Sequence, residues 1–286
     1  MLSYIHAYHA GNFADILKHT VFAYTLEHLL KKEKPFTVID CHSASGKYAF
    51  DDDRLEKTGE AKNGIKKLLN KNEKNLQTMF GNSFSKILVS YAEKGFYPGS
   101  PEIARCYLRK NDQLILNELH PKIKIELEKN LSQKILIQKN ELPHIQVLSK
   151  DAAKMLNAVL PPKIKRGCVI IDPSYEDSEE FFTTAQYFIA SYKKWMTGTF
   201  LLWYPLLKDR ENEAEFLKQT IYSNVEKQNK TDDEKCIFFE LQAKNAEDVE
   251  GFSKMYGSGM LVVNPPFDLK ERIQFSLNAM EDALKE

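Results

Sequence analysis

The order of apolar and polar residues along this 286-residue chain predicts strands that alternate with helices. Short apolar runs typical of buried strands lie at 36–40, 113–118, 144–148, 168–172, 199–204, 236–241 and 259–263. Helical spacing of apolar residues falls between them, at 13–34, 102–110, 121–130, 151–160, 178–194 and about 210–227. Such alternation is typical of an α/β protein with a doubly wound, mostly parallel sheet. The last two strands have no clear helix between them, which predicts an antiparallel hairpin at one end of the sheet.

One segment, 51–97, departs from this alternation. It is rich in Lys and Asn, with short helical patches at 64–69 and 84–89, and it carries more basic than acidic residues. We interpret 51–97 as an inserted helical subdomain. The main domain is then formed by 1–50 together with 98–286.

Composition narrows the class of protein without identifying it. The 40 basic and 40 acidic side chains balance, which argues against a polycation that coats nucleic acid but leaves local patches open. Two patches are candidates for nucleic-acid contact: Lys62, Lys66, Lys67, Lys71 and Lys74 in the insertion, and Lys163, Lys165 and Arg166. Four widely spaced cysteines, no signal peptide and no apolar run of membrane-spanning length predict a cytoplasmic protein without a membrane segment.

Acidic residues stand at or just after four of the predicted strands: Asp40, Glu118, Asp151 and Asp172. In open α/β sheets ligands bind beyond the carboxyl ends of the strands, so these acids predict a nucleoside-binding crevice. Glu118 is placed to accept both ribose hydroxyls, and Asp151 to accept from an adenine amine. The small-residue loop 41–46 would approach the cofactor's tail. Taken singly, Glu118 also fits a solvated strand end, and Asp151 fits a helix N-cap.

The most specific motif is Asp172-Pro173-Ser174-Tyr175, which is similar to the [DN]-P-P-[YFW] motif of amino-methyltransferases. The lone pair of an adenine N6 is delocalised into the ring, so the amine is a poor nucleophile. Asp172 and the carbonyl of Pro173 can accept its two N–H groups and favour the pyramidal amine of the transition state. Tyr175 is expected to stack on the base, which must leave its helix or loop. An ordinary turn after a strand is the alternative interpretation.

A second stretch, Asn264-Pro265-Pro266-Phe267, fits the same motif without deviation, whereas Ser174 replaces the usual second proline in the first. Strand order favours the first stretch. The fourth strand of such a sheet adjoins the cofactor strand, and the seventh does not. We therefore interpret 264–267 as a structural end of the sheet.

Longer motifs resemble one family. The first twenty residues, Met1 to Thr20, strongly resemble the start of the bacterial large-subunit ribosomal RNA methyltransferase J family. Further matching motifs follow in the family's order, at 97–101, 118–121, 171–176, 202–205 and 259–266. The resemblance implies N6-methylation of one adenine in 23S ribosomal RNA by S-adenosylmethionine, on a Rossmann-like class I methyltransferase fold with seven strands and a small helical insertion.

The resemblance also implies roles for single residues. It implies cofactor contacts at His19, His42, Ser100, Glu118, Asp151, Ala152 and Asp172, the catalytic acceptor at Asp172, and RNA contacts at Tyr4, His6 and Lys18. The motif chemistry adds Pro173 and Tyr175 to Asp172 as the catalytic group. The expected substrate is 23S ribosomal RNA free of ribosomal proteins, and the expected oligomeric state is a monomer. No metal site is expected, because the His6-x-x-His9 spacing is a weak ligand motif.

Two alternatives stay open at this point. A DNA adenine methyltransferase would use the same motif, although the chain has no obvious target-recognition domain for DNA. A non-enzymatic nucleic-acid-binding protein serving the use of external DNA would bind nucleic acid without affinity for S-adenosylmethionine.

Overall fold

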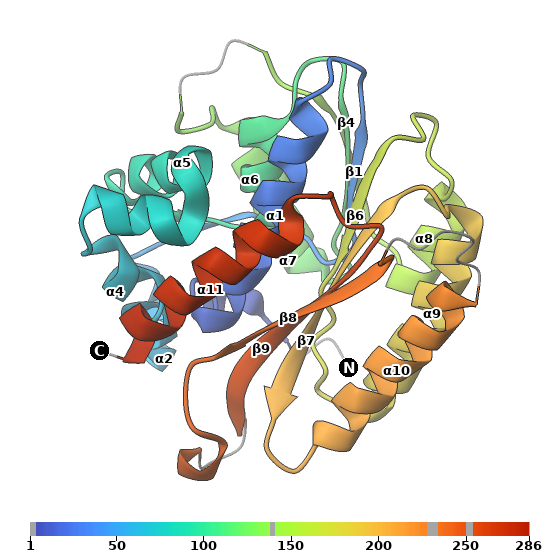
Figure 1. The fold of residues 1–286 in the computed structure, drawn as a ribbon. Coiled ribbons are helices and arrows are strands. Elements are labelled where there is room, and N and C mark those ends of the chain that lie inside the picture. Colours follow the sequence, from blue (N-terminus) through green and yellow to red (C-terminus); the bar gives the residue numbers. More distant parts are fainter. Residues whose placement is uncertain (1–3, 138–140, 228–233, 250–253, 286) are drawn as a thin grey trace.

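A seven-stranded sheet lies at the centre of the molecule (Figure 1), whose computed structural model describes residues 4–137, 141–227, 234–249 and 254–285. Its strands are β1 (Thr37–Asp40), β4 (Gln113–Asn117), β5 (His144–Leu148), β6 (Gly167–Ile171), β7 (Thr199–Leu207), β8 (Cys236–Gln242) and β9 (Met255–Val263). Each one overlaps a strand predicted from an apolar run. The strand order is β5-β4-β1-β6-β7-β9-β8.

Strand directions confirm the predicted α/β class. β1 pairs in parallel with both β4 and β6, and β5 and β7 extend the parallel sheet on either side. β9 runs antiparallel to β7 and to β8, so the last two strands form the predicted hairpin. The chain winds outward in both directions from β1, and the carboxyl end of β1 is therefore the switch point at which such sheets bind ligands.

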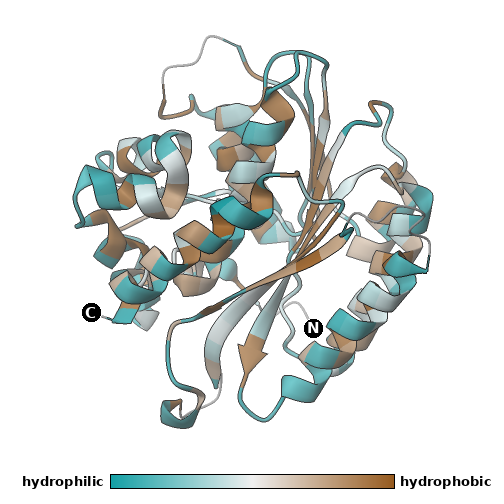
Figure 2. Cartoon of the chain, viewed as in Figure 1, coloured by the Kyte–Doolittle hydropathy of each residue, from teal (hydrophilic) through white to brown (hydrophobic). Residues whose placement is uncertain are grey.

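Helices cover both faces of the sheet. They are α1 (Phe13–Leu30), α6 (Ser100–Tyr107), α7 (Pro121–Ser132), α8 (Ala152–Val159), α9 (Glu179–Lys194), α10 (Glu211–Glu226) and α11 (Leu269–Lys285), with 3-10 turns η1 (His6–Tyr8) and η2 (Ala246–Asp248). Figure 1 shows α8, α9 and α10 on one face and α1, α6 and α11 on the other. Figure 2 shows apolar strands at the centre and hydrophilic outer faces on α9 and α10. The sequence analysis did not predict α11.

The segment 51–97 is helical, as expected, and contains α2 (Asp53–Thr58), α3 (Glu60–Asn63), α4 (Ile65–Leu69) and α5 (Glu73–Ala92). Two short strands that were not predicted, β2 (Lys47–Ala49) and β3 (Phe96–Pro98), flank these helices and pair antiparallel. α5 packs against α11, and the apolar side chains of the segment belong to the same core as those of the sheet. The division into a main domain and an insertion thus stays an interpretation of the sequence.

Candidate active site

A cavity of about 470 Å³ opens at the carboxyl ends of β1, β4, β5 and β6. Its size and position fit a small-molecule site at the switch point of an α/β sheet. Eight residues that the sequence analysis singled out line it together: Tyr4, His6, His42, Glu118, Asp151, Ala152, Asp172 and Pro173. The acids that follow β4, β5 and β6 are therefore brought to one place, as expected from their positions at strand ends.

On the β4 and β5 side, Glu118 and Asp151 stand beside the cavity. The Glu118 carboxylate accepts the backbone N–H of His120 at 2.7 Å, and burial raises the pKa of Glu118. Asp151 accepts the N–H of Lys154 at 3.1 Å, so it caps α8 as well as lining the cavity. The two interpretations of Asp151 are therefore compatible, because capping engages only one of its two oxygens.

Asn117, which the sequence analysis missed, holds this side of the cavity together. Its amide donates to the carbonyls of Cys41 and Lys150 at 3.0 and 2.9 Å, and its oxygen accepts the N–H of Lys150 at 3.0 Å. One buried side chain thus ties the loops after β1, β4 and β5. The available signal was a polar residue at the end of an otherwise apolar strand.

His42 connects the cavity lining to the Asp172 motif. Its Nδ1 accepts the backbone N–H of Asp172 at 3.0 Å. Burial lowers the pKa of His42 to about 4, although the nearby Asp172 carboxylate opposes this. The ring is therefore neutral near pH 7. Because a backbone N–H can only donate, the ring proton must sit on Nε2.

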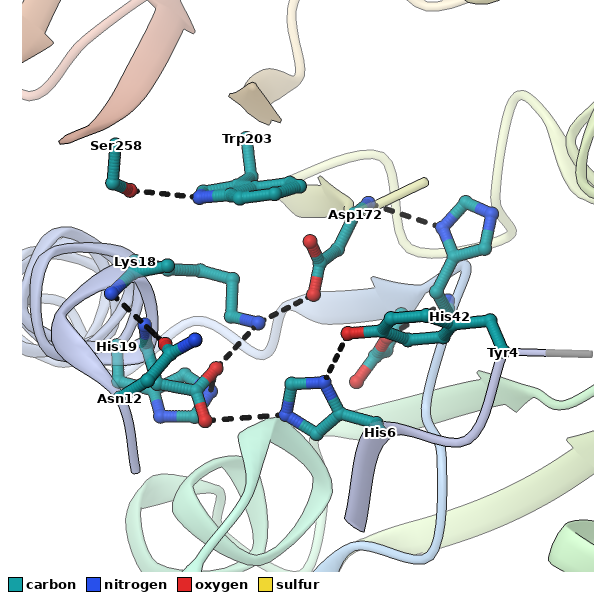
Figure 3. A network of polar contacts seen from close by, with 12 residues as sticks. Tyr4, His6, Asn12, Lys18, His19, His42, Asp172, Trp203 and Ser258 are labelled. Atoms are coloured by element: carbon teal, nitrogen blue, oxygen red, sulfur yellow. Dashed lines mark hydrogen bonds and ion pairs between the residues drawn. The ribbon is translucent and has the colours of Figure 1, made fainter. Parts of the chain in front are cut away.

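Beneath the cavity, an ion network anchors the Asp172 carboxylate (Figure 3). Lys18 Nζ lies between Asp172 Oδ2 and Asp15 Oδ1, the latter at 2.7 Å. Burial alone would lower the pKa of Lys18, but the two carboxylates outweigh it and raise that pKa, so Lys18 is charged. From the family resemblance we expect Lys18 to contact RNA. The structure instead places its buried ammonium against two acids.

The N-terminal residues reach the same network from the mouth of the cavity. The Tyr4 hydroxyl and His6 Nδ1 are 3.0 Å apart, and His6 Nε2 lies 3.1 Å from Asp15 Oδ2. Figure 3 shows Tyr4 and His6 on the side of Asp172 opposite Trp203. Met1 to Ser3, the first residues of the family-like motif, lie outside the described residues.

Two predicted cofactor contacts lie behind the cavity lining. His19 is 1% exposed, and its Nδ1 lies 2.7 Å from the Tyr97 hydroxyl. Burial lowers the pKa of His19 to about 3, so its ring is neutral. Ser100 is buried, and burial raises the pKa of the nearby Asp40 carboxylate to about 6, although Ser100 lowers it.

Tyr175 differs from expectation. Its ring packs against Phe181 and Trp203, with centroids 4.3 and 5.7 Å apart, and its hydroxyl donates to the Trp203 carbonyl at 3.0 Å. Only 2% of Tyr175 is exposed, so in this conformation its ring does not face the cavity, contrary to the expectation that it stacks on a base there. The physical reason is the backbone: Tyr175 has φ +51°, and the ring packs into the core between β7 and α9.

The second motif lies away from the cavity, and several residues of the predicted basic patches are engaged in bonds within the protein. Because β9 runs antiparallel to β7, its carboxyl end lies beside the start of β7. Residues 264–267 therefore lie at the end of the sheet opposite to Asp172. Arg166 precedes β6 at that same end and donates to the carbonyls of Leu29 and Lys34. In the insertion, the Lys66 and Lys67 ammonium groups donate to backbone carbonyls, which leaves Lys62 and Lys74 as its exposed candidates.

Within the described ranges, no helix is long and apolar enough to cross a membrane, and no group of three His, Cys, Asp or Glu side chains could hold a metal ion.

Comparison with known proteins points to one family. The model of the family described as "Ribosomal RNA large subunit methyltransferase D, RlmJ" matches residues 33–286. The ribosomal RNA large subunit methyltransferase J of Escherichia coli strain K12 is 33% identical over 280 residues, covering 96% of this chain and 90% of the relative. The protein of the same name from Haemophilus influenzae is 35% identical over 275 residues, covering 96% and 91%. The crystal structure of protein LPL1258 from Legionella pneumophila superposes with a TM-score of 0.79 at 30% identity, over 97% of this chain and 94% of that one.

Proposed function

Because the chain belongs to the RlmJ family of large-subunit ribosomal RNA methyltransferases, we propose that it methylates N6 of one adenine in 23S ribosomal RNA, with S-adenosylmethionine as methyl donor. The observation that carries this proposal is the meeting of Asp172 and Pro173 with Glu118 and Asp151 around one cavity. The first pair suits an amine acceptor, and the second suits a nucleoside cofactor.

The residues present fit the cofactor. Glu118 and Asp151 offer carboxylate oxygens to ribose hydroxyls and to an adenine amine, and Ala152 offers backbone beside them. His42, with its proton on Nε2, adds a donor at the same wall. When bound, S-adenosylmethionine supplies an electrophilic methyl group on a sulfonium centre.

Asp172 and Pro173 would act on the amine. The Asp172 carboxylate and the Pro173 carbonyl accept its N–H groups, which turns the nitrogen lone pair out of conjugation with the ring. Positive charge develops on the amine as the methyl transfers, and a fixed carboxylate stabilises that charge. The Lys18 ammonium opposes this effect, but Asp15 neutralises it on its other side. The network thus orients Asp172 without cancelling its charge.

Tyr4, and not Tyr175, presents an aromatic ring at the mouth of the cavity. It lines the cavity and is 39% exposed, whereas Tyr175 is buried. An extruded adenine can stack on such a ring, as bases do on aromatic side chains in RNA recognition. Tyr4, with His6 beside it, is therefore our candidate for contact with the RNA base.

Methyl transfer from labelled S-adenosylmethionine tests the proposal. Protein-free 23S RNA and a DNA fragment of the same sequence compete in one reaction, and mass mapping locates the label. We expect label at one adenine N6 in the RNA. Label in the DNA alone would support a DNA adenine methyltransferase. The absence of cofactor binding in calorimetry, with nucleic-acid binding intact, would support the non-enzymatic alternative.

A further inference from the structure

The insertion is hydrogen-bonded to the N-terminal segment that borders the cavity. The backbone N–H of Ile65 donates to the Gly11 carbonyl at 2.8 Å, and the Thr58 hydroxyl donates to the Tyr8 carbonyl. Gly64 is needed for this approach, because a Cβ at that position would lie 2.3 Å from the Gly11 oxygen. The helices α2, α3 and α4 therefore fix the course of residues 8–11.

The carboxylate of Glu60, in the insertion, has two partners in the N-terminal segment. Glu60 Oε1 lies 2.9 Å from His9 Nδ1, and Glu60 Oε2 accepts from Asn12 Nδ2 at 2.9 Å. Asn12 in turn caps α1, accepting the N–H groups of Ala14 and Asp15 at 2.9 and 3.0 Å. Glu60 thus holds His9 and the start of the helix that carries Asp15 and Lys18.

His9 carries this constraint to the cavity. Its ring stacks on Tyr4, with centroids 5.5 Å apart and planes inclined by 7°. Tyr4 lines the cavity and contacts His6, which contacts Asp15. A path of contacts therefore leads from the insertion through His9 to Tyr4 at the cavity mouth, beside the one that runs through Asn12 to the start of α1.

The charges on this path favour the same geometry. Burial lowers the pKa of His9, but the bond to Glu60 outweighs it, so the net shift is upward. Burial raises the pKa of Glu60, but the His9 bond outweighs it, so the net shift is downward. The pair is therefore charged at mildly acidic pH, and a cationic imidazole stacks favourably on a tyrosine ring.

We propose that Glu60 is a positioning residue for methyl transfer, fixing the Tyr4 ring at the cavity mouth through His9. The inference rests on the proposed function, because RNA methylation is its principal readout. It assigns the insertion a role as the scaffold of the N-terminal wall. The side chains of His9 and Glu60 are 37% and 34% exposed, so their pairing contributes little to overall stability. A fall in rate without a comparable fall in stability is therefore the signature of positioning.

The test compares Glu60→Ala, His9→Ala and the double variant with Glu56→Ala, which removes an exposed carboxylate of the same insertion. Kinetics on a 23S RNA fragment give kcat and KM for RNA and for S-adenosylmethionine. We expect each single variant to lower kcat about tenfold, since small misplacements of positioning groups have effects of up to about a hundredfold. KM for S-adenosylmethionine should stay near the wild-type value. The double variant should be much less impaired than the product of the two single effects, because the contact of Glu60 with the Tyr4 ring runs through His9. Glu56→Ala should behave as wild type.

Wild-type kcat in Glu60→Ala would overturn the proposal, as would multiplied effects in the double variant. Thermal unfolding of each variant shows whether a loss of rate is a loss of folded protein. Glu60→Gln adds a conservative comparison, because its amide oxygen can still accept from His9 or from Asn12, but not from both. Its kcat should lie between those of wild type and Glu60→Ala.

A second measurement separates this inference from the proposed function. The ring resonances of isotopically labelled Tyr4 report its stacking on His9 and require no catalysis. They should shift in Glu60→Ala and not in Glu56→Ala. An unchanged Tyr4 signal would overturn the positioning role even in an active enzyme. A wild-type protein that methylates no RNA would instead overturn the proposed function, with the Tyr4 shift still observable.

Discussion

Two stretches of this chain fit the amino-methyltransferase motif. They lie at opposite ends of the sheet along the direction of its strands. Asn264 to Phe267 matches the motif letter for letter, whereas Asp172 to Tyr175 carries a serine at its third position. β6 is parallel to β1 and delivers Asp172 to the cavity. β9 is antiparallel and delivers Asn264 to the other end. A motif at a strand end therefore has meaning only together with the direction of that strand.

The polar side chains of the two stretches also face different partners. Asp172 meets a charged lysine and the cavity. The side-chain nitrogen of Asn264 donates to the carbonyls of Met196 and Gly198 at 2.8 and 2.7 Å. Each stretch has one residue in the left-handed region, Asn264 at φ +53° and Tyr175 at φ +51°. Asn adopts this conformation readily and a bulky Tyr does not, so the backbone strain is concentrated in the Asp172 stretch.

The largest expected effect separates the two stretches by activity. Asp172→Asn keeps the size of the side chain but removes its charge, and we expect kcat to fall about 10²- to 10³-fold, as when other transition-state acceptors or donors are lost. Asn264→Ala should keep kcat within about twofold of wild type, equivalent to about 0.4 kcal/mol. Methyl transfer to 23S RNA measures both, and calorimetry checks that Asp172→Asn still binds S-adenosylmethionine. If Asn264→Ala loses activity and Asp172→Asn does not, our assignment of the reaction to the Asp172 stretch is wrong.

Asn264 should instead matter for stability. Asn264→Ala leaves two carbonyls without their donor and replaces Asn, which adopts positive φ readily, with Ala, which does not. We therefore expect a loss of about 2 kcal/mol in the free energy of unfolding. Urea unfolding measures this loss. The matched control is Thr199→Val, which removes only the hydroxyl bond to the Asn264 carbonyl at 2.9 Å and should lose about 1 kcal/mol. An unchanged midpoint in Asn264→Ala would show that 264–267 is not a structural end of the sheet.

Much of this arrangement follows from local sequence. Each of the seven strands is an apolar run of suitable length, and the parallel topology then gathers Glu118, Asp151 and Asp172 without further information. α11 also had a readable signal, since Leu269, Ile273, Leu277 and Met280 are buried at helical spacing. The sequence therefore contains enough information to predict α11.

Burial in α1 could not be read in the same way. Its periodicity predicts one apolar face, yet the structure buries Lys18 and His19 as well, because Lys18 lies against Asp172 after β6 and His19 against Tyr97 of β3. A buried lysine requires carboxylate partners, and one of them, Asp172, lies 154 positions away. The pairing of His9 with Glu60, 51 positions apart, is likewise set by tertiary packing.

The aromatic residues of the two stretches give a smaller contrast. Tyr175→Phe removes the buried bond to the Trp203 carbonyl, and we expect a loss of about 1 kcal/mol in the free energy of unfolding. Phe267→Ala should change it by no more than about 0.5 kcal/mol, because Phe267 is 87% exposed. Urea unfolding measures the free energy of unfolding of both variants. An unchanged free energy of unfolding in Tyr175→Phe would mean that the Tyr175 hydroxyl contributes nothing in its buried position.

The smallest expected effect concerns the one mismatch in the Asp172 stretch. Ser174→Pro restores the common motif but removes the contact of the hydroxyl with Glu180, at 3.2 and 3.3 Å from its two oxygens. The amine acceptors belong to Asp172 and Pro173, so kcat should stay within about threefold of wild type, or about 0.7 kcal/mol. Ser174→Ala, which loses the hydroxyl without gaining the ring, separates the two changes. Burial already raises the pKa of Glu180 and the Ser174 bond opposes this, so both variants should raise that pKa further. A tenfold gain in Ser174→Pro alone would show that loop rigidity, rather than the acceptors, limits the reaction.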